Sequence, residues 1–457
     1  MRRTLMCLLA LTTATSVITA SAQNPPARPS APAPGKPPAN PSAKPPAKPS
    51  AKPAARPAAG GDERCIFQID NVDRQGSVIE TPRGTNYFAG GNVRLRCRGT
   101  QTSMQSDSVA AYGGTVVQFI GNVKYRDSTL SMDADFGTYF KAGEKWEARG
   151  RVNTRNLRTG STIVGPALDY FRELRGVRDT FEMFSTGRPR VAYASLDSAG
   201  SASDPYVIVG DRIRARGNDR LWAGGKVTVD RSDFTARGDS LRLDTGTGSD
   251  GTLVGGQPQM KGLGRDTFSL SGRRIDLKLD NRQLTYVIAK GNGRAVSRDW
   301  YLVGDTIALD LNDRKLERTL AWGDSTRPSA TSTAYALKAD SLALDTPGQR
   351  LRQVRGFGRA WLGGQVDSAA KDRDWMRGDT IIADFAPRDS AGTTRQLLSR
   401  IQARKGAQSY HLDPDRRFPT RPGVNYARGD AITVTMRRDG ANGVDRVDVR
   451  GQVDGVQ

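Results

Sequence analysis

The sequence predicts an all-β protein, a repetitive antiparallel β-jellyroll or solenoid in which strands form an open, twisted stack. Three observations predict this fold. Beyond Gly61 apolar and polar residues alternate with a period of two, and no long helical period interrupts them. Glycine contributes 50 of the 457 residues and punctuates the apolar segments. Finally, "ARGDSLRLDT" at 236 has close copies at 302, 336, 376 and 427.

The alternation places apolar side chains on one face of each expected strand. In the segment 129–140, Leu130, Met132, Phe136 and Phe140 share a face, and Asp133 lies on the other. Such a strand buries one face and exposes the other to water.

The copies of the Gly-Asp motif recur at intervals of 28 to 39 residues. A unit of this size cannot bury its own apolar face, so neighbouring units must stack. The aspartate after glycine is expected to bond backbone amides at a turn, where it opens each strand unit. The positions taken as equivalent are Asp211, Asp239, Arg273, Asp305, Asp340 and Asp379.

Composition divides the chain into five segments. Residues 1–22 have a basic start, a short apolar stretch and a small-residue cleavage site, which predicts a secretory signal peptide. Residues 23–61 are rich in Pro, Ala and Lys and are expected to be a disordered linker. Residues 62–186 are expected to form one β-jellyroll, 187–205 a linker, and 206–457 further, degenerate β repeats. The sequence therefore predicts an exported protein.

The chain is strongly basic, with a formal net charge of +21. Residues 1–60 hold eight basic residues and no acidic ones, so the remainder is basic in its own right. This balance suits anionic partners such as a phosphorylated glycolipid or a cell-wall polymer. Export argues against nucleic acid. The linker lysines are compatible with peripheral contact with the cell wall or the outer membrane.

Two cysteines remain after removal of the signal peptide, Cys65 and Cys97. In an oxidising compartment an even pair indicates a disulfide, which would close a loop of about 30 residues and add roughly 3 kcal/mol. Two separately buried thiols are the alternative.

Residues 90–171 carry a more specific pattern. Gly91-Asn92-Val93 and Gly121-Asn122-Val123 each lead into an apolar strand, and strands bearing Asp-Ser or Asp-Phe follow. This rhythm resembles the OstA-like repeat of the lipopolysaccharide-transport proteins, found in LptA and in the N-terminal periplasmic domain of LptD. The resemblance covers about 80 residues well and the later repeats only in a degraded form.

The resemblance implies a carrier that lies in the periplasm, either free or associated with the outer membrane. Its apolar interior would bind the acyl chains of lipopolysaccharide or another anionic glycolipid, and it would stack end to end with other Lpt-type β-jellyroll proteins. A fully packed core, with no room for lipid, is the alternative. The side chains expected to line the lipid path are Val93, Leu95, Val117, Phe119, Val123, Tyr125, Leu130, Met132, Phe136, Phe140, Trp146, Val152 and Val164.

Motifs for catalysis are scarce, and we expect no enzymatic activity, no metal site and no cofactor. The single histidine, His411, lies in a Pro-rich segment, which gives little support to a metal site or a Ser-His-acid triad. The acid pairs Asp133/Asp135 and Asp372/Asp374 could serve polysaccharide cleavage, but aspartates recur at one offset in unit after unit, which favours an architectural role. The main rival function is a structural or polysaccharide-binding β-solenoid with a packed core.

Overall fold

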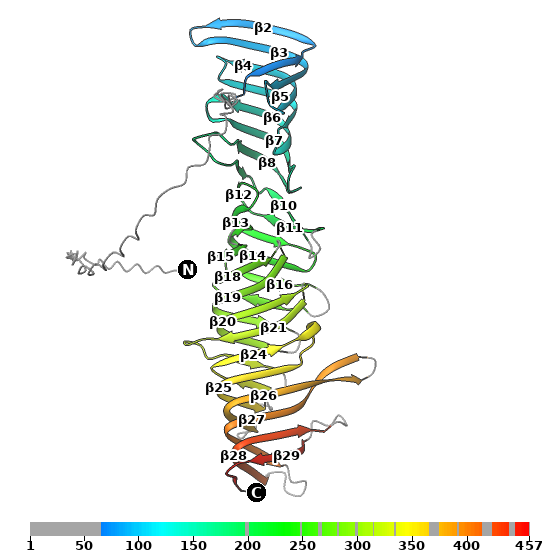
Figure 1. Cartoon of the computed structure of the whole chain (residues 1–457), viewed down its shortest axis with the longest axis vertical. Helices are drawn as coiled ribbons and strands as arrows, with labels where there is room; N and C mark the ends of the chain where they lie inside the picture. The colour runs from blue at the N-terminus through cyan, green and yellow to red at the C-terminus, as the bar shows by residue number, and fades with distance from the viewer. Residues whose placement is uncertain are drawn as a thin grey trace, which may run out of the picture. The chain divides into compact units, whose positions relative to one another are not determined.

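The computed structural model describes residues 65–196, 201–246, 249–263, 267–280, 283–297, 300–313, 315–332, 335–364, 374–390, 393–413, 423–437 and 444–456. The expected signal peptide and the Pro-rich linker lie outside the described residues. Gly61–Gln457 form one compact unit. The 30 strands that the described residues form belong to one hydrogen-bonded sheet, and their pairs are antiparallel, which confirms the predicted all-β stack (Figure 1).

The strands follow one another along the stack. The first ten are β1 (Phe67–Asn71), β2 (Arg74–Thr81), β3 (Gly84–Cys97), β4 (Ser103–Tyr112), β5 (Val116–Arg126), β6 (Leu130–Phe140), β7 (Lys145–Asn156), β8 (Thr162–Phe171), β9 (Glu182–Thr186) and β10 (Arg190–Leu196). The next ten are β11 (Ala202–Val209), β12 (Arg212–Arg216), β13 (Arg220–Asp230), β14 (Phe234–Asp244), β15 (Asp250–Val254), β16 (Gln259–Gly262), β17 (Ser269–Ser271), β18 (Arg274–Asp280), β19 (Gln283–Val296) and β20 (Tyr301–Asn312). The last ten are β21 (Lys315–Trp322), β22 (Ser329–Thr331), β23 (Tyr335–Lys338), β24 (Ser341–Asp345), β25 (Gln353–Gly364), β26 (Trp375–Ser390), β27 (Thr393–Asp413), β28 (Gly423–Met436), β29 (Val444–Arg450) and β30 (Asp454–Val456). Two single 3₁₀ turns, η1 (Lys141–Gly143) and η2 (Pro347–Gln349), lie in connections.

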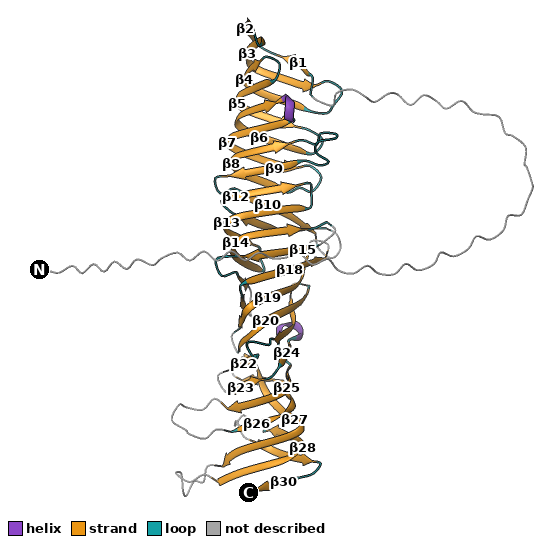
Figure 2. Ribbon diagram, turned by 90° about the vertical axis from the view of Figure 1, so that its left-hand side faces the viewer, coloured by secondary structure: helices purple, strands orange, loops and turns teal. Residues whose placement is uncertain are grey.

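The sheet is folded lengthwise into two walls, because each long strand bends near its middle. In β14, residues 234–237 pair with β16 whereas residues 240–244 pair with β15. Wall A consists of β1, β10, β11, β16, β17, β22, β23 and β30 with one half of each long strand. Wall B consists of β2, β9, β12, β15, β18, β21, β24 and β29 with the other half. Figure 2 shows the strands stacked side by side along this unit.

The bend changes which residues face inward. In β14, Phe234 and Ala236 are buried before the bend, and Leu241 and Leu243 are buried after it. The inward positions therefore shift from even to odd numbers at Asp239, where the pairing register also shifts. One extra residue in a strand is a β-bulge, which bends the strand and redirects its side chains. Both halves of β14 thus present apolar residues to the space between the walls.

The bends coincide at a corner where an aspartate faces a glycine of the neighbouring strand. A Cβ on Gly121 would lie 2.4 Å from the Asp107 carboxylate, and Gly121 has φ +77°, which glycine adopts without strain. Asn122 follows it with φ 47° and donates a hydrogen bond to Asp107 at 2.8 Å. The same close approach to glycine recurs at Asp73, Asp135, Asp211, Asp239, Asp305, Asp340 and Asp430.

This geometry corrects the expected role of the aspartate in part. Of the six positions taken as equivalent, Asp211, Arg273 and Asp340 directly precede a strand, as predicted, but Asp239, Asp305 and Asp379 lie in mid-strand, in β14, β20 and β26. The motif therefore marks the corner of the stack. The conformation depends on the neighbouring strand, which the local pattern alone does not specify.

The expected linker at 187–205 is also corrected. Residues of β10 pair with β8 and β11, and β11 pairs with β13, so strands of the sheet occupy most of the described residues of this segment. The buried apolar side chains accordingly form one cluster that extends from Cys65 to Ile432. In the part of the chain described here, no helix has the length and apolar character needed to cross a membrane.

Candidate functional site

The space between the walls is the candidate site, and most of the predicted lining residues lie in it. Ten of the thirteen are buried, with exposed fractions of 6% or less. They alternate along β3, β5, β6 and β7 and belong to the continuous apolar cluster. These ten are Val93, Leu95, Val117, Phe119, Val123, Tyr125, Leu130, Met132, Trp146 and Val152.

The other three predicted lining residues face outward, so their assignment was wrong. Phe136 is 54% exposed because the bulge at Asp135 restarts the alternation one residue later. For the same reason Phe140 lies on the outer face of wall B, where Lys145 Nζ lies 5.7 Å from the centre of its ring. Val164 is 45% exposed, and its neighbour Ile163 points inward.

Aromatic rings fill the interior in the first third of the stack. The centre of the Trp146 ring lies 5.0 Å from that of Phe119, 4.7 Å from that of Tyr125 and 5.7 Å from that of Tyr139. Tyr170 lies 6.0 Å from Tyr125. Tyr125 belongs to wall A and the others to wall B, so the rings pack directly between the walls. This stretch of the interior is occupied by the protein's own side chains.

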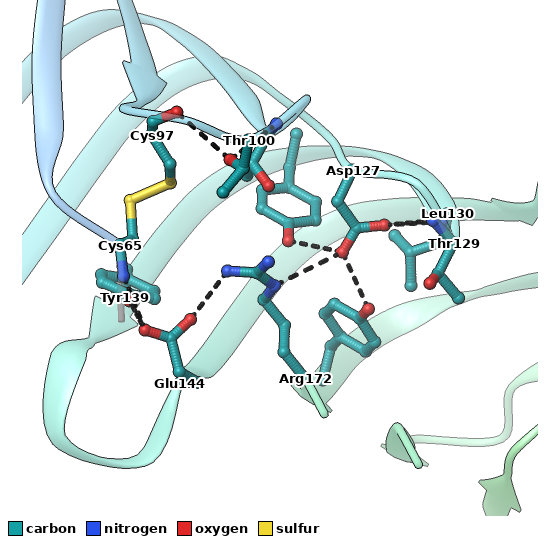
Figure 3. Close-up of polar contacts among 12 residues, drawn as sticks. Cys65, Cys97, Thr100, Asp127, Thr129, Leu130, Tyr139, Glu144 and Arg172 are labelled. Carbon is teal, nitrogen blue, oxygen red and sulfur yellow. Dashed lines mark hydrogen bonds and ion pairs between the residues drawn. A yellow bond between two sulfur atoms is a disulfide. The ribbon is translucent and has the colours of Figure 1, made fainter. Parts of the chain in front are cut away.

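The two walls also meet at the ends of their strands, on the side away from the corner. We call this side of each wall its edge, and we call the contact between the two edges the polar seam (Figure 3). The seam consists of Asp127, Glu144, Arg172, Tyr125, Tyr139 and Tyr170. Asp127 lies in the turn after β5, at the edge of wall A. It accepts hydrogen bonds from the hydroxyl of Tyr125 at 2.7 Å and, across the seam, from that of Tyr170 at 2.8 Å. The backbone N–H groups of Thr129 and Leu130 donate to its other oxygen at 2.7 and 2.8 Å.

Glu144 completes the seam from the edge of wall B. It is 1% exposed and accepts hydrogen bonds from the Tyr139 hydroxyl at 2.5 Å and from Arg172 Nη1 at 2.8 Å. It also accepts one from the backbone N–H of Cys65, at the edge of wall A, at 2.9 Å. Cys65 forms a disulfide with Cys97, so the seam is tied covalently to β3.

Burial and nearby charges shift the pKa values of the side chains in the seam. Asp127 and Glu144 are both buried, and Arg172 lies 3.7 Å and 2.8 Å from them. Burial alone would lower the pKa of Arg172, but the surrounding tyrosines and carboxylates raise it. Burial, and then the negative charge of Asp127, raise the pKa values of Tyr125 and Tyr170 well above 10. These tyrosines therefore remain protonated hydrogen-bond donors. The seam fastens the walls to each other.

Farther along the stack the interior is aliphatic and less completely filled. A cavity of about 30 Å³ lies between the walls, lined on the wall A side by Ile208 and Met260 and on the wall B side by Leu253 and Leu277. This volume admits one or two water molecules, but the lining is apolar, and such cavities stay dry. Leucine and methionine are side chains that can repack around a guest.

The acidic pairs considered for catalysis are engaged elsewhere. Asp135 binds Arg151 at the corner, at 2.8 Å, whereas Asp133 lies on the outer face of wall A. Asp374 contacts His411 Nδ1 at 2.7 Å and accepts a hydrogen bond from the Leu412 N–H at 2.9 Å, across the edge of β27. Burial alone would raise the pKa of Asp374, but these bonds lower it. Its expected companion, Asp372, lies outside the described residues.

The sequence reasoning missed the seam. Asp127, Glu144 and Arg172 lie in three different turns, and only the long-range folding of the sheet brings them together. The one local signal is Asp-Ser-Thr at 127–129, a typical turn sequence whose partners across the seam it does not reveal.

Comparison with known proteins gave limited similarity. No protein-family model matches the chain, and no curated protein matches it. Among solved structures the chain is similar to LptH from Pseudomonas aeruginosa, described as the LptA homologous periplasmic component of the lipopolysaccharide transport device. That match has 15% sequence identity and a TM-score of 0.24, and it covers 28% of this chain and 94% of LptH.

Proposed function

We propose that the protein is an exported, non-enzymatic carrier that binds lipopolysaccharide or a related anionic glycolipid and passes it through the periplasm towards the outer membrane. The observation that carries this proposal is the apolar interior, which is continuous from Cys65 to Ile432 between the two walls. Acyl chains would lie between the walls while the sugars remain in water. The OstA-like rhythm of residues 90–171 agrees with this function.

The aliphatic stretch around the cavity is the proposed point of lipid entry. The seam and the aromatic rings hold the walls together between Cys65 and Phe181, whereas the lining from Ile208 to Leu284 consists mainly of leucine, isoleucine, valine and methionine. Acyl chains would enter by parting the walls there, and burial of each methylene group contributes about 0.8 kcal/mol.

Both ends of the described sheet support stacking with other Lpt-type β-jellyroll proteins. At one end β1 and β2 each pair with β3, and at the other β29 and β30 each pair with β28. Apolar side chains are exposed at these ends, among them Ile69 and Val78 at the first and Val447 and Val453 at the second. Edge strands of this kind are templates for pairing with another sheet.

A second candidate function is a structural β-solenoid that binds polysaccharide on its surface. The observation that favours it is the filled interior around Trp146 together with the closed seam. In that case the interior would never admit lipid, and the walls would act as a rigid support.

Lipid analysis separates the two candidates. The protein is purified from the periplasm of a lipopolysaccharide-producing host and examined by native mass spectrometry. We expect near-stoichiometric glycolipid on the wild type. In the Met260→Trp variant, whose indole occupies the cavity, we expect at least about a tenfold loss of bound lipid.

Lys261→Trp is the matched control, because Lys261 is the next residue of β16 and faces outward. It should retain lipid, and circular dichroism establishes that both variants fold. A folded wild-type protein without lipid, or equal lipid on both variants, would contradict the carrier function.

A further inference from the structure

One row of outward-facing positions crosses wall A from strand to strand. It begins at Arg94 on β3 and continues through directly paired residues to Arg428 on β28, twenty positions in all. We call it the basic row. Its first half contains the cations Arg94, Lys124, Arg190 and Arg237. Its second half contains Arg294, Lys338, Arg377 and Arg428.

The basic row has almost no negative charge. Asp133 is the only acidic residue among these twenty positions, and although it is directly opposite Lys124, no ion pair joins the two. The next position in the same register is Asp454 on β30, opposite Arg428, so the cationic part of the row ends there. All eight cations are exposed. None of them forms an ion pair with a described residue; Arg94 and Arg377 bond only the neutral side chains of Asn92 and Gln408.

The outer face of wall B is built differently. There cations and acids lie close together and pair, at 2.6 to 3.1 Å: Arg214 with Glu182, Arg274 with Asp276, Arg318 with Asp345 and Arg400 with Asp384. The basic row is therefore a property of one face. It is not simply the result of a high arginine content.

We propose that the basic row is the binding surface for a linear acidic polysaccharide that lies along the stack of strands. The cations lie two to four strands apart, roughly 10 to 19 Å at the usual strand spacing of about 4.8 Å. This spacing suits a chain with widely spaced carboxylates or phosphates. Between the cations the row presents hydroxyl and amide groups, such as Gln105, Thr228 and Ser271, which can bond sugar hydroxyls.

Aromatic rings beside the row support a sugar partner. Trp361 belongs to the row, and Lys338 Nζ lies 5.9 Å from the centre of its ring. Trp375 and Tyr410 occupy the neighbouring outward row and stack at 6.0 Å with an interplanar angle of 7°. All three residues are half-buried.

The geometry disfavours two other anionic partners. Nucleic acid carries a charge about every 3.4 Å along each strand, several times denser than the cations of the row. A membrane surface would be matched by a broad patch. The neighbouring outward row starts with such basic residues, Arg96, Arg126 and Arg155. Between Thr162 and Tyr426, however, Lys261 is its only cation among the described residues, and this part also contains Asp230, so most of the length of wall A presents a single basic row and not a broad patch.

The test measures binding of the full chain to hyaluronan oligosaccharides, which carry one carboxylate per disaccharide, by titration calorimetry. The row variant replaces Arg190, Arg237, Arg294 and Lys338 by glutamine. We expect the wild type to bind, the affinity to fall as salt is raised, and the row variant to lose about tenfold or more.

The matched control carries Arg214→Gln, Arg274→Gln, Arg318→Gln and Arg400→Gln on wall B. It loses the same net charge and keeps the same N-terminal lysines, and the exposed ion pairs it breaks contribute little to stability. We expect less than about a threefold loss of affinity. Circular dichroism verifies the fold of both variants.

Three results would overturn the proposal. Equal losses in the two variants would mean that net charge alone governs binding. Absence of binding to hyaluronan, together with row-dependent binding to a single-stranded DNA oligonucleotide or to phosphatidylglycerol vesicles, would assign the row to another polyanion. Absence of binding to all three probes would leave the row without a polyanionic partner. The lipid content of the row variant should equal that of the wild type, because the substitutions lie outside the interior. This measurement therefore separates failure of the row proposal from failure of the carrier function.

Discussion

At the scale of single residues, the unusual feature is the burial of two carboxylates with one guanidinium. Removal of Asp127, Glu144 and Arg172 from water is costly, and such networks contribute little net stability. Their hydrogen bonds, however, are directional and join residues from both wall edges. We interpret the seam as the device that fixes how the two edges meet.

Loss of the seam's cation tests this interpretation. In Arg172→Met the two buried carboxylates lose their counter-charge, and removal of one partner from a buried network costs about 3 to 5 kcal/mol. Hydrogen exchange of the amides of Thr129 and Leu130, which donate to Asp127, should become about a hundredfold faster or more.

Arg149→Met is the control for that substitution. Arg149 pairs with Glu147 and Asp169 on the outer face of wall B and is 44% exposed, so its loss should cost less than about 1 kcal/mol. Similar exchange rates in the two variants would show that the seam does not hold the edges.

The seam also predicts alkaline sensitivity. The pKa values of Tyr125, Tyr139 and Tyr170 are raised above 10 in the folded protein. Burial is the largest cause, and the nearby carboxylates add to it through their negative charge and their hydrogen bonds with the hydroxyl groups. Above pH 10 the unfolded chain therefore releases protons that the folded chain retains, and stability falls as pH rises, by up to about 1.4 kcal/mol per pH unit for each tyrosine. Urea unfolding between pH 8 and 11.5 measures this slope. Tyr125→Phe should flatten it, and the exposed Tyr87→Phe should not; equal slopes in both variants would contradict the prediction.

The sequence predicted inward-facing residues where the alternation is unbroken, as for Val117, Phe119 and Leu130. It failed for Phe136 because one bulge residue reverses every assignment after it in the strand. A bulge is fixed by the partner strand, which a single strand's pattern does not contain.

At the scale of elements, the corner decides where each strand bends. Gly121→Ala should destabilise the folded protein for two reasons. The backbone of residue 121 has φ +77°, and the new Cβ would lie 2.4 Å from the Asp107 carboxylate. We expect a loss of about 2 to 4 kcal/mol in the free energy of unfolding, measured by urea denaturation.

Gly99→Ala separates the two causes. Gly99 has a similar φ of +73° but no atom within 4 Å of the added Cβ, so the backbone cost alone applies, about 1 kcal/mol. Asp107→Ala should restore part of the loss in Gly121→Ala. No difference between Gly121→Ala and Gly99→Ala would show that the aspartate is not pressed against the corner.

The corner also explains the repeated tripeptide Arg-Gly-Asp. At 237–239, 377–379 and 428–430 the arginine belongs to the basic row, and the aspartate lies at the bend. The sequence revealed the repetition and its architectural meaning. It did not reveal the row, because successive cations of the row lie up to 66 residues apart in the sequence, as Lys124 and Arg190 do, and only the register aligns them.

At the scale of the whole molecule, the folded sheet presents two surfaces of different chemistry. The inner one is apolar and suits acyl chains, whereas the basic row on the outer face of wall A consists mostly of cations and neutral polar residues and suits a polyanion. The stacking of strands and the apolar interior followed from alternation and repeats. The closed seam did not, because it depends on turns that come together only once the sheet has folded.

The central claim is that lipid lies between the walls, and site-directed photo-crosslinking tests it most directly. A photoreactive phenylalanine analogue is placed at Leu253, which points into the interior, or at Thr252, the adjacent outward residue of β15. Irradiation takes place in a lipopolysaccharide-producing host. The account predicts a glycolipid adduct at Leu253 and none at Thr252. Adducts of equal yield at both positions, or a folded protein without an adduct at either, would contradict it.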